Sequence, residues 1–144
     1  MKLVIQRVTR GKVTVNNQIV GQIENGYVIL VGFKEEDSNE QVELLTKKML
    51  NMRIMSDDND KMNRSIIDVH GELLLIPQFT LYADTKKRRP SFSKAAKPEK
   101  AENLFRFFVE EVKKGKLKTE IGEFGAKMAV ELTNDGPVTI VLEN

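Results

Sequence analysis

The sequence predicts a single α+β domain with one large, rolled, barrel-like β-sheet of mixed but largely antiparallel strands and two α-helices packed on one face. Three features lead to this fold class. Short runs rich in Val and Ile, separated by turn residues, fill the first third of the chain, and similar runs return in the last third. Two longer segments between them carry apolar residues at helical spacing. Because no repeat, linker or low-complexity tract divides the 144 residues, we expect one domain over residues 1–144.

The composition excludes several classes of protein. The chain has no cysteine, hence no disulfide framework and no cysteine-based zinc site, which favours a reducing compartment. No segment approaches the ~20 apolar residues of a membrane span, so we expect a soluble cytoplasmic protein without a membrane partner. The net charge of +2 is too small to identify a nucleic-acid partner, because affinity for phosphates depends on where Lys and Arg are placed.

The first third of the chain predicts a meander of four strands. Asn and Gly at 16–17 and 24–26 suit tight hairpin turns, because both residues tolerate positive φ. The last of the four runs lacks polar alternation, which indicates a strand covered on both faces. The predicted strands are residues 2–8, 12–16, 18–23 and 27–33.

A helix is predicted from Ser38 to about Asn51. Ser38 is a favourable N-cap, and Gln41, three residues later, completes a capping box. Apolar residues recur on one stripe, which we expect to face the sheet as core rather than to bind a cofactor. The stripe consists of Val42, Leu45, Met49 and Met52.

Short strands are predicted at 53–55 and 65–69, with a polar loop at 56–60 between them. The acidic spacing of this loop resembles a calcium site, but it lacks the turn glycine and the glutamate at the twelfth position, so we expect no metal. His70 and Gly71 then form a turn into the next strand.

Residues 73–82 form the stretch around which the chain is organised. They are rich in Leu, Ile, Phe and Thr and predict a buried strand, yet Pro77 cannot donate to a β-ladder. The strand must therefore be interrupted at Pro77. An interruption beside Gln78, Phe79 and Thr80 frees backbone N–H groups for an anion or oxyanion site. The alternative is a simple bulge at which Gln78 and Thr80 are merely polar.

A basic segment follows at 83–98, with a single acid, Asp84. Its six cations either contact phosphates or form a solvated face. They are Lys86, Lys87, Arg88, Arg89, Lys94 and Lys97.

A second helix is predicted from Pro98, with Gly115 as the C′ glycine and Lys113 and Lys114 at its carboxyl end. Its buried stripe comprises Leu104, Phe105, Phe108, Val109 and Val112. The last third predicts strands at 117–121, 124–133 and 138–143. Residues 134–137 between the last two strands are expected to form a turn.

Few side chains are available for catalysis. His70 is the only histidine, and no serine and third orienting group can be assigned to it, so a Ser-His-Asp triad has little support. Thr80 could act as a nucleophile only if a base removed its proton, and the sequence offers no obvious base.

Six motifs, spread over the whole chain in order and register, resemble the D-aminoacyl-tRNA deacylase family, also called D-tyrosyl-tRNA deacylase. These motifs are Gln6-Arg7-Val8, Lys61-Met62-Asn63, Gln78-Phe79-Thr80-Leu81, Arg89-Pro90-Ser91-Phe92, Phe124-Gly125-Ala126 and Asn134-Asp135-Gly136-Pro137-Val138-Thr139.

The resemblance implies a homodimer that hydrolyses the ester between a D-amino acid and the terminal adenosine of tRNA, without a cofactor. Glycine wrongly attached to tRNA is a further expected substrate. Gln78, Phe79 and Thr80 would line the pocket and orient the ester. Gly136 and Pro137, joined by a cis peptide bond, would reach into the partner's pocket as a chirality filter.

The remaining residues that the resemblance assigns are Arg7, which would belong to the filter, and four cations, which would contact tRNA. These cations are Lys86, Lys87, Arg88 and Arg89. The chain departs from the family pattern at Pro77, where serine is usual, and in a basic loop that is one residue short.

The absence of an evident base favours a mechanism in which the ribose hydroxyl beside the ester positions the attacking water. The Phe79 N–H is then the candidate oxyanion donor, with the Thr80 N–H and the Gln78 amide as alternatives. Two other hypotheses stay open: Thr80 as a covalent nucleophile, and a non-catalytic RNA-binding module that acts through residues 86–97.

Overall fold

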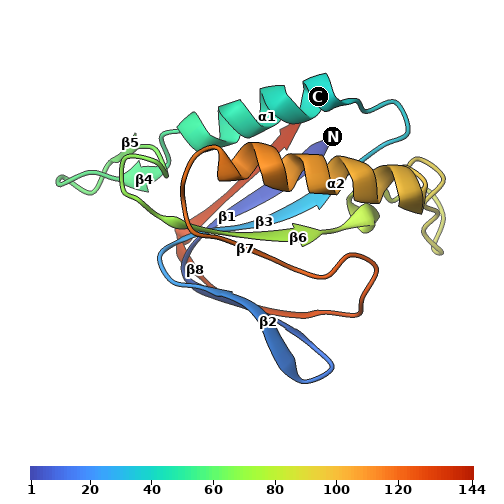
Figure 1. The fold of residues 1–144 in the computed structure, drawn as a ribbon, viewed down its shortest axis with the longest axis horizontal. Helices are drawn as coiled ribbons and strands as arrows, with labels where there is room; N and C mark the ends of the chain where they lie inside the picture. Colours follow the sequence, from blue (N-terminus) through green and yellow to red (C-terminus); the bar gives the residue numbers. More distant parts are fainter.

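A long, bent strand, β1 (Lys2–Val15), organises the sheet. A computed structural model describes residues 1–144 and shows β1 crossing the molecule (Figure 1). Its first half lies between two strands, β3 and β8, and its second half between β2 and β8. The other strands of the sheet are β2 (Gln18–Ile23), β3 (Gly26–Gly32), β6 (Glu72–Pro77), β7 (Thr119–Ile121) and β8 (Ala129–Glu143).

The sheet is mixed, as the sequence predicts. Strand β1 is antiparallel to its three neighbours, whereas β6 runs parallel to both β3 and β7. The strand order β2-β1-β3-β6-β7, with β8 on the other side of β1, rolls the sheet until β2 approaches β6 and β7. The result is the nearly closed, barrel-like α+β domain that the sequence predicts.

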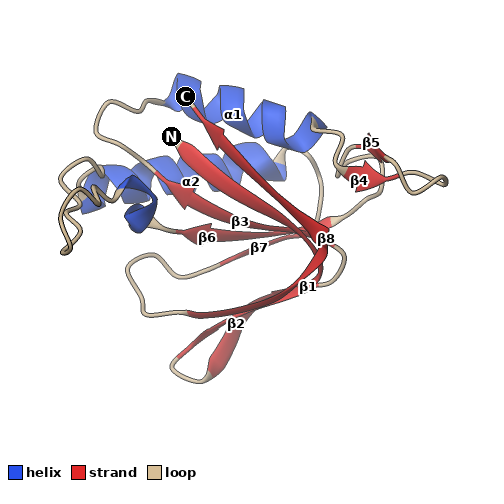
Figure 2. Ribbon diagram, turned by 180° about the vertical axis from the view of Figure 1, so that it is seen from behind, coloured by secondary structure: helices blue, strands red, loops and turns tan.

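Two helices, α1 (Asn39–Asn51) and α2 (Pro98–Lys113), cover one face of the sheet, again as predicted (Figures 1 and 2). The side chain of Gln41 accepts a hydrogen bond from the Ser38 N–H at 2.8 Å, which confirms the start of the first helix. The predicted apolar stripes of both helices lie in the main core, although Met52 is only partly buried. No helix is long and apolar enough to cross a membrane.

A second, smaller core fills the inside of the rolled sheet. It consists of Val8, Val13, Ile23, Val28, Leu74 and Ile76. Strand β3 therefore has a core on each face, which confirms the interpretation of its unbroken apolar run.

The prediction of four N-terminal strands is wrong, because residues 2–15 form one strand. Arg10 and Gly11 pair with Thr133 and Leu132 of β8, so the ladder continues through the expected gap. At the other end of the chain, β8 likewise continues through 134–137, where we expected a turn, and residues 124–128 lie outside any strand.

The predicted strand at 65–69 is also wrong. The Ser65 N–H donates to the Asp68 carboxylate at 2.8 Å and the Asp68 N–H donates to the Ser65 hydroxyl at 3.2 Å, so the segment folds into a turn. The local strand pair is instead β4 (Met55–Ser56) with β5 (Met62–Arg64). The left-handed residue after α2 is Lys116, with φ 56°, rather than Gly115.

Candidate active site

The predicted interruption at Pro77 is confirmed and marks the candidate site. Strand β6 ends at Pro77, and a 3₁₀ helix, η1 (Phe79–Tyr82), begins two residues later. Between them the Gln78 N–H donates to the Val31 carbonyl of β3 at 2.7 Å. Gly32 permits this approach, because a Cβ there would lie 2.9 Å from the Gln78 carbonyl oxygen.

A cavity of about 420 Å³ opens beside this junction. The end of β3, the start of η1, the approach to α2 and the loop around Phe124 form its walls. Lys97 is its one ionisable residue. The lining consists of Val31, Gly32, Phe33, Pro77, Gln78, Phe79, Phe92, Ala95, Ala96, Lys97, Pro98, Ala101, Phe124 and Gly125.

Two backbone donors at the start of η1 are available to a ligand. The first turn of a helix leaves its leading N–H groups without an intrahelical acceptor, and here these belong to Phe79 and Thr80. Neither group takes part in the hydrogen bonds of the surrounding loops. The Gln78 side-chain amide donates to the Thr80 hydroxyl.

The cavity contains no carboxylate or imidazole side chain that could act as a general base. His70 lies in the turn before β6, at the opposite end of that strand. Burial, with smaller contributions from nearby carboxylates, raises the pKa of Tyr82 above its usual range, so this phenol stays protonated at neutral pH. No group of three or more carboxylate, imidazole or thiol side chains is arranged to hold a metal ion.

Aromatic residues shape both the inside and the mouth of the cavity. Phe124 packs against Phe105 of α2, with ring centroids 6.3 Å apart. At the mouth, Phe79 and Phe92 form an edge-to-face pair with centroids 5.0 Å apart. The motifs that carry the family resemblance contain Phe92 and Phe124, but their spacing along the chain gave no sign that both line one cavity.

Residues 84–91 of the predicted basic segment form a closed loop next to this mouth. Backbone hydrogen bonds of 2.8 and 3.0 Å between Asp84 and Ser91 join its two ends. The four candidate tRNA contacts project from it, all exposed and none in an ion pair. They are Lys86, Lys87, Arg88 and Arg89.

The predicted filter residues lie together, but elsewhere in the molecule. The Gly136–Pro137 peptide bond is cis, as the resemblance implies. Arg7 is buried beside it, with its side chain 9% exposed. Its Nε donates to the Asp135 carbonyl at 3.1 Å and its Nη1 donates to the Ile54 carbonyl at 2.9 Å.

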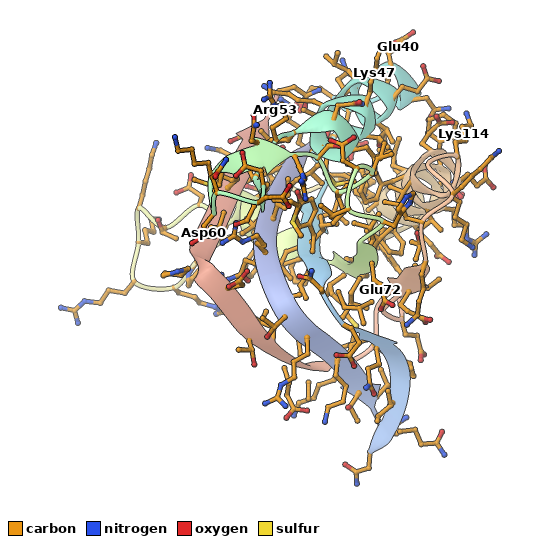
Figure 3. The ribbon with its side chains drawn as sticks, turned by 90° about the vertical axis from the view of Figure 1, so that its left-hand side faces the viewer. Glu40, Lys47, Arg53, Asp60, Glu72 and Lys114 are labelled. Atoms are coloured by element: carbon orange, nitrogen blue, oxygen red, sulfur yellow. The ribbon has the colours of Figure 1, made fainter.

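Within one chain, the filter residues do not lie beside Gln78 and the cavity. Arg7 pairs with Tyr27 and Tyr27 pairs with Leu73, so the filter residues lie level with the start of β6, whereas Gln78 follows its end. Gln78 is five residues beyond Leu73, which at about 3.3 Å per residue places it about 16 Å further along the strand direction. Figure 3 views the molecule from the end at which β6 begins, near Glu72.

Comparisons with known proteins identify the family of the chain. The family model described as D-Tyr-tRNA(Tyr) deacylase matches residues 4–143. Proteins named D-aminoacyl-tRNA deacylase from Thermosipho africanus and Clostridioides difficile are each 50% identical to the chain over 145 residues, covering 100% of it and 97% of each relative.

Two solved structures have the same fold. One, described as c-Myc DNA Unwinding Element Binding Protein, has a TM-score of 0.94 and 39% identity, covering 100% of this chain and 99% of its own. The other, a probable eukaryotic D-amino acid tRNA deacylase, has a TM-score of 0.86 at 16% identity, covering 98% and 97%. From the family match and the 50% identity over its full length, the chain belongs to the D-Tyr-tRNA(Tyr) deacylase family of ester hydrolases.

Proposed function

We propose that this D-aminoacyl-tRNA deacylase works without a side-chain base and uses the tRNA as part of its own catalyst. The observation that carries the proposal is the cavity beside Gln78, which contains backbone donors and an amide but no carboxylate or imidazole. A cavity of this kind can orient an ester and stabilise an oxyanion, but it has no carboxylate or imidazole to deprotonate water.

The terminal ribose supplies the missing group. Its 2′-hydroxyl lies next to the ester at the 3′ oxygen, within reach of a water that attacks the carbonyl carbon. As the tetrahedral intermediate forms, the carbonyl oxygen gains negative charge, which the Phe79 N–H stabilises, assisted by the Thr80 N–H. The 2′-hydroxyl accepts the proton that the attacking water loses and gives up its own proton to the 3′ oxygen as the intermediate collapses and the bond to that oxygen breaks, so that free amino acid and tRNA leave.

The hydrogen bond between Gln78 and Thr80 argues against a covalent mechanism. The Thr80 hydroxyl accepts from the Gln78 amide, a neutral donor that cannot remove the hydroxyl proton. A nucleophilic threonine needs a neighbouring base, and the only side-chain partner of the Thr80 hydroxyl is the Gln78 amide. We therefore assign Thr80 to the orientation of Gln78 and of the ester.

We further propose a homodimer in which the Asp135–Gly136–Pro137 segment of one subunit completes the cavity of the other. The Arg7 guanidinium fixes this segment by a clamp of two hydrogen bonds, one to the Asp135 carbonyl and one to the Ile54 carbonyl. The segment lies too far from Gln78 to act on an ester in its own chain. Backbone carbonyls placed near the substrate's α-carbon would bind the amino group and exclude an L side chain by shape. Glycine has no side chain to exclude, so glycine attached to tRNA would also be hydrolysed.

The test is a comparison of four substrates with the same enzyme. We expect D-tyrosyl-tRNA and glycyl-tRNA to be hydrolysed, L-tyrosyl-tRNA to survive, and D-tyrosyl-tRNA ending in 2′-deoxyadenosine to react far more slowly. Equal rates for D- and L-tyrosyl-tRNA would refute the filter, and a normal rate for the deoxy substrate would refute the RNA-assisted mechanism. Binding of tRNA without any hydrolysis would support the RNA-binding module instead. Sedimentation analysis tests the dimer.

A further inference from the structure

Two aromatic rings are exposed at the mouth of the cavity. Phe79 is 56% exposed and Phe92 is 39% exposed, whereas most large apolar side chains of the chain lie in one of the two cores. Their edge-to-face contact, with centroids 5.0 Å apart, fixes one ring against the other. Part of each ring therefore remains uncovered in a defined orientation.

The two rings belong to different segments of the chain. Phe79 is the first residue of η1 and carries the candidate oxyanion N–H. Phe92 directly follows Ser91, whose backbone closes the basic loop on Asp84. The aromatic pair thus occupies the position between the candidate catalytic backbone and four unpaired cations.

Exposed aromatic rings beside unpaired Lys and Arg side chains are the combination that binds single-stranded nucleic acid. The rings stack on bases of any sequence, and the cations contact the phosphates that link those bases. The 3′ end of tRNA is such a strand. Its terminal adenosine carries the ester, so it must enter the cavity where Phe124 and the Phe79 N–H lie, and the nucleotide before it remains at the mouth.

We propose that the Phe79–Phe92 pair is the stacking platform for the nucleotide that precedes the terminal adenosine of the substrate. This inference rests on the proposed function, because it assumes that the ester lies beside Gln78. Stacking on the two rings does not depend on which base is bound. It positions the single-stranded RNA between the basic loop and the cavity. A second copy of the chain is the competing occupant, but four unpaired cations beside the rings complement an RNA strand better than a protein surface with their own charge.

Phe92 is the residue to change, since Phe79 also supplies a backbone group to catalysis. Phe92→Leu keeps an apolar side chain but removes the aromatic face, and Phe92→Tyr keeps the face. Leu44→Ala is the matched control, because Leu44 is an exposed apolar residue of α1 on another part of the surface.

The assay measures kcat/KM for D-tyrosyl-adenosine and for D-tyrosyl-cytidylyl-adenosine, and the readout is the ratio of the two values. We expect the second nucleotide to raise kcat/KM of the unchanged enzyme by about fivefold to 150-fold, the range that stacking of one base supplies. Phe92→Leu should reduce this ratio towards one, while Phe92→Tyr and Leu44→Ala should preserve it. The ratio is independent of any general loss of activity.

A ratio that is equal in Phe92→Leu and the unchanged enzyme would overturn the proposal. Loss of the dimer in Phe92→Leu, seen by sedimentation, would also overturn it, by showing that a partner subunit covers the ring. Binding of the unacylated trinucleotide CCA separates this inference from the proposed function. If no ester is hydrolysed, the proposed function fails, yet weaker CCA binding by Phe92→Leu than by Phe92→Tyr would still support the platform.

Discussion

Replacing Arg7 by lysine tests whether the buried guanidinium fixes the segment that we assign to the chirality filter. Lysine keeps the positive charge but has one compact ammonium group, which cannot span from the Asp135 carbonyl to the Ile54 carbonyl as the guanidinium does. We expect the variant to lose one of these two contacts. The Asp135–Pro137 segment would then become less well fixed relative to β4.

The structure sets the size of the effect. A hydrogen bond to a charged group contributes about 1.5–3 kcal/mol, and a buried acceptor left without a donor costs about 1–3 kcal/mol. The ion pair with the Asp135 carboxylate, at 3.2 Å, adds little, because that side chain is 45% exposed. We therefore expect Arg7→Lys to lower the free energy of unfolding by about 2–4 kcal/mol, and the melting temperature by about 6–12 °C for a chain of this length.

Two measurements check this reasoning. Thermal unfolding gives the stability loss, and deacylation of D- and L-tyrosyl-tRNA gives the selectivity, which should fall more than the rate on the D substrate. Arg10→Lys is the matched control, because Arg10 lies on the same strand but is exposed and donates only to the Thr133 hydroxyl, at 3.2 Å. An Arg7→Lys variant with unchanged stability and unchanged D/L selectivity would refute the clamp.

Three further predictions concern Thr80, the exposed cations of the basic loop, and Asp68. Thr80→Ala should retain measurable hydrolysis, because nothing activates the hydroxyl as a nucleophile, and a trapped acyl-enzyme on Thr80 would contradict this. Replacing both Lys86 and Arg88 by alanine should weaken tRNA binding and lower the slope of log affinity against log salt concentration by about two; an unchanged slope would mean a solvated loop. Hydrogen bonds from Ser65 lower the pKa of Asp68, so the stability that Asp68 contributes should be present above about pH 4 and lost as the pH falls further. Urea unfolding of Asp68→Asn should accordingly differ from that of the unchanged protein at pH 6, and the difference should shrink as the pH falls below about 4.

The elements that the sequence predicts correctly are those specified by their own residues. The capping box at Ser38 and Gln41 determines where α1 begins whatever packs against it, and Pro77 ends β6 because it has no N–H to donate. The unbroken apolar run of β3 reflects the two cores on either side of it. In each case the physical cause lies within a few residues of the feature.

The failed predictions involve partners that are remote in sequence. Residues 9–11 look like a break between strands, but β8 supplies a ladder that carries β1 through them. The β-branched residues at 66–69 favour a strand, yet the side chains of Ser65 and Asp68 bond to each other's backbone and offer the chain a turn instead. Hydrophobic pattern alone also cannot show that β6 pairs in parallel with β3.

Some residues of the candidate site are determined locally, and others depend on partners that are remote in sequence. The sequence could therefore name residues of the site but could not predict its shape. Gln78, Phe79 and Thr80 directly follow the strand end at Pro77, so the sequence alone indicates where the candidate oxyanion donors lie. Phe92 and Phe124 belong to segments that approach this point only in the folded chain. Gly136 and Pro137 on β8 lie three strands away from β6, across β3 and β1, which is about 14 Å sideways at about 4.8 Å per strand in addition to the displacement along it. A clamp at that distance can act on the ester only if a second subunit brings another copy of it to the cavity, so the separation within one chain is itself the physical argument for the proposed dimer.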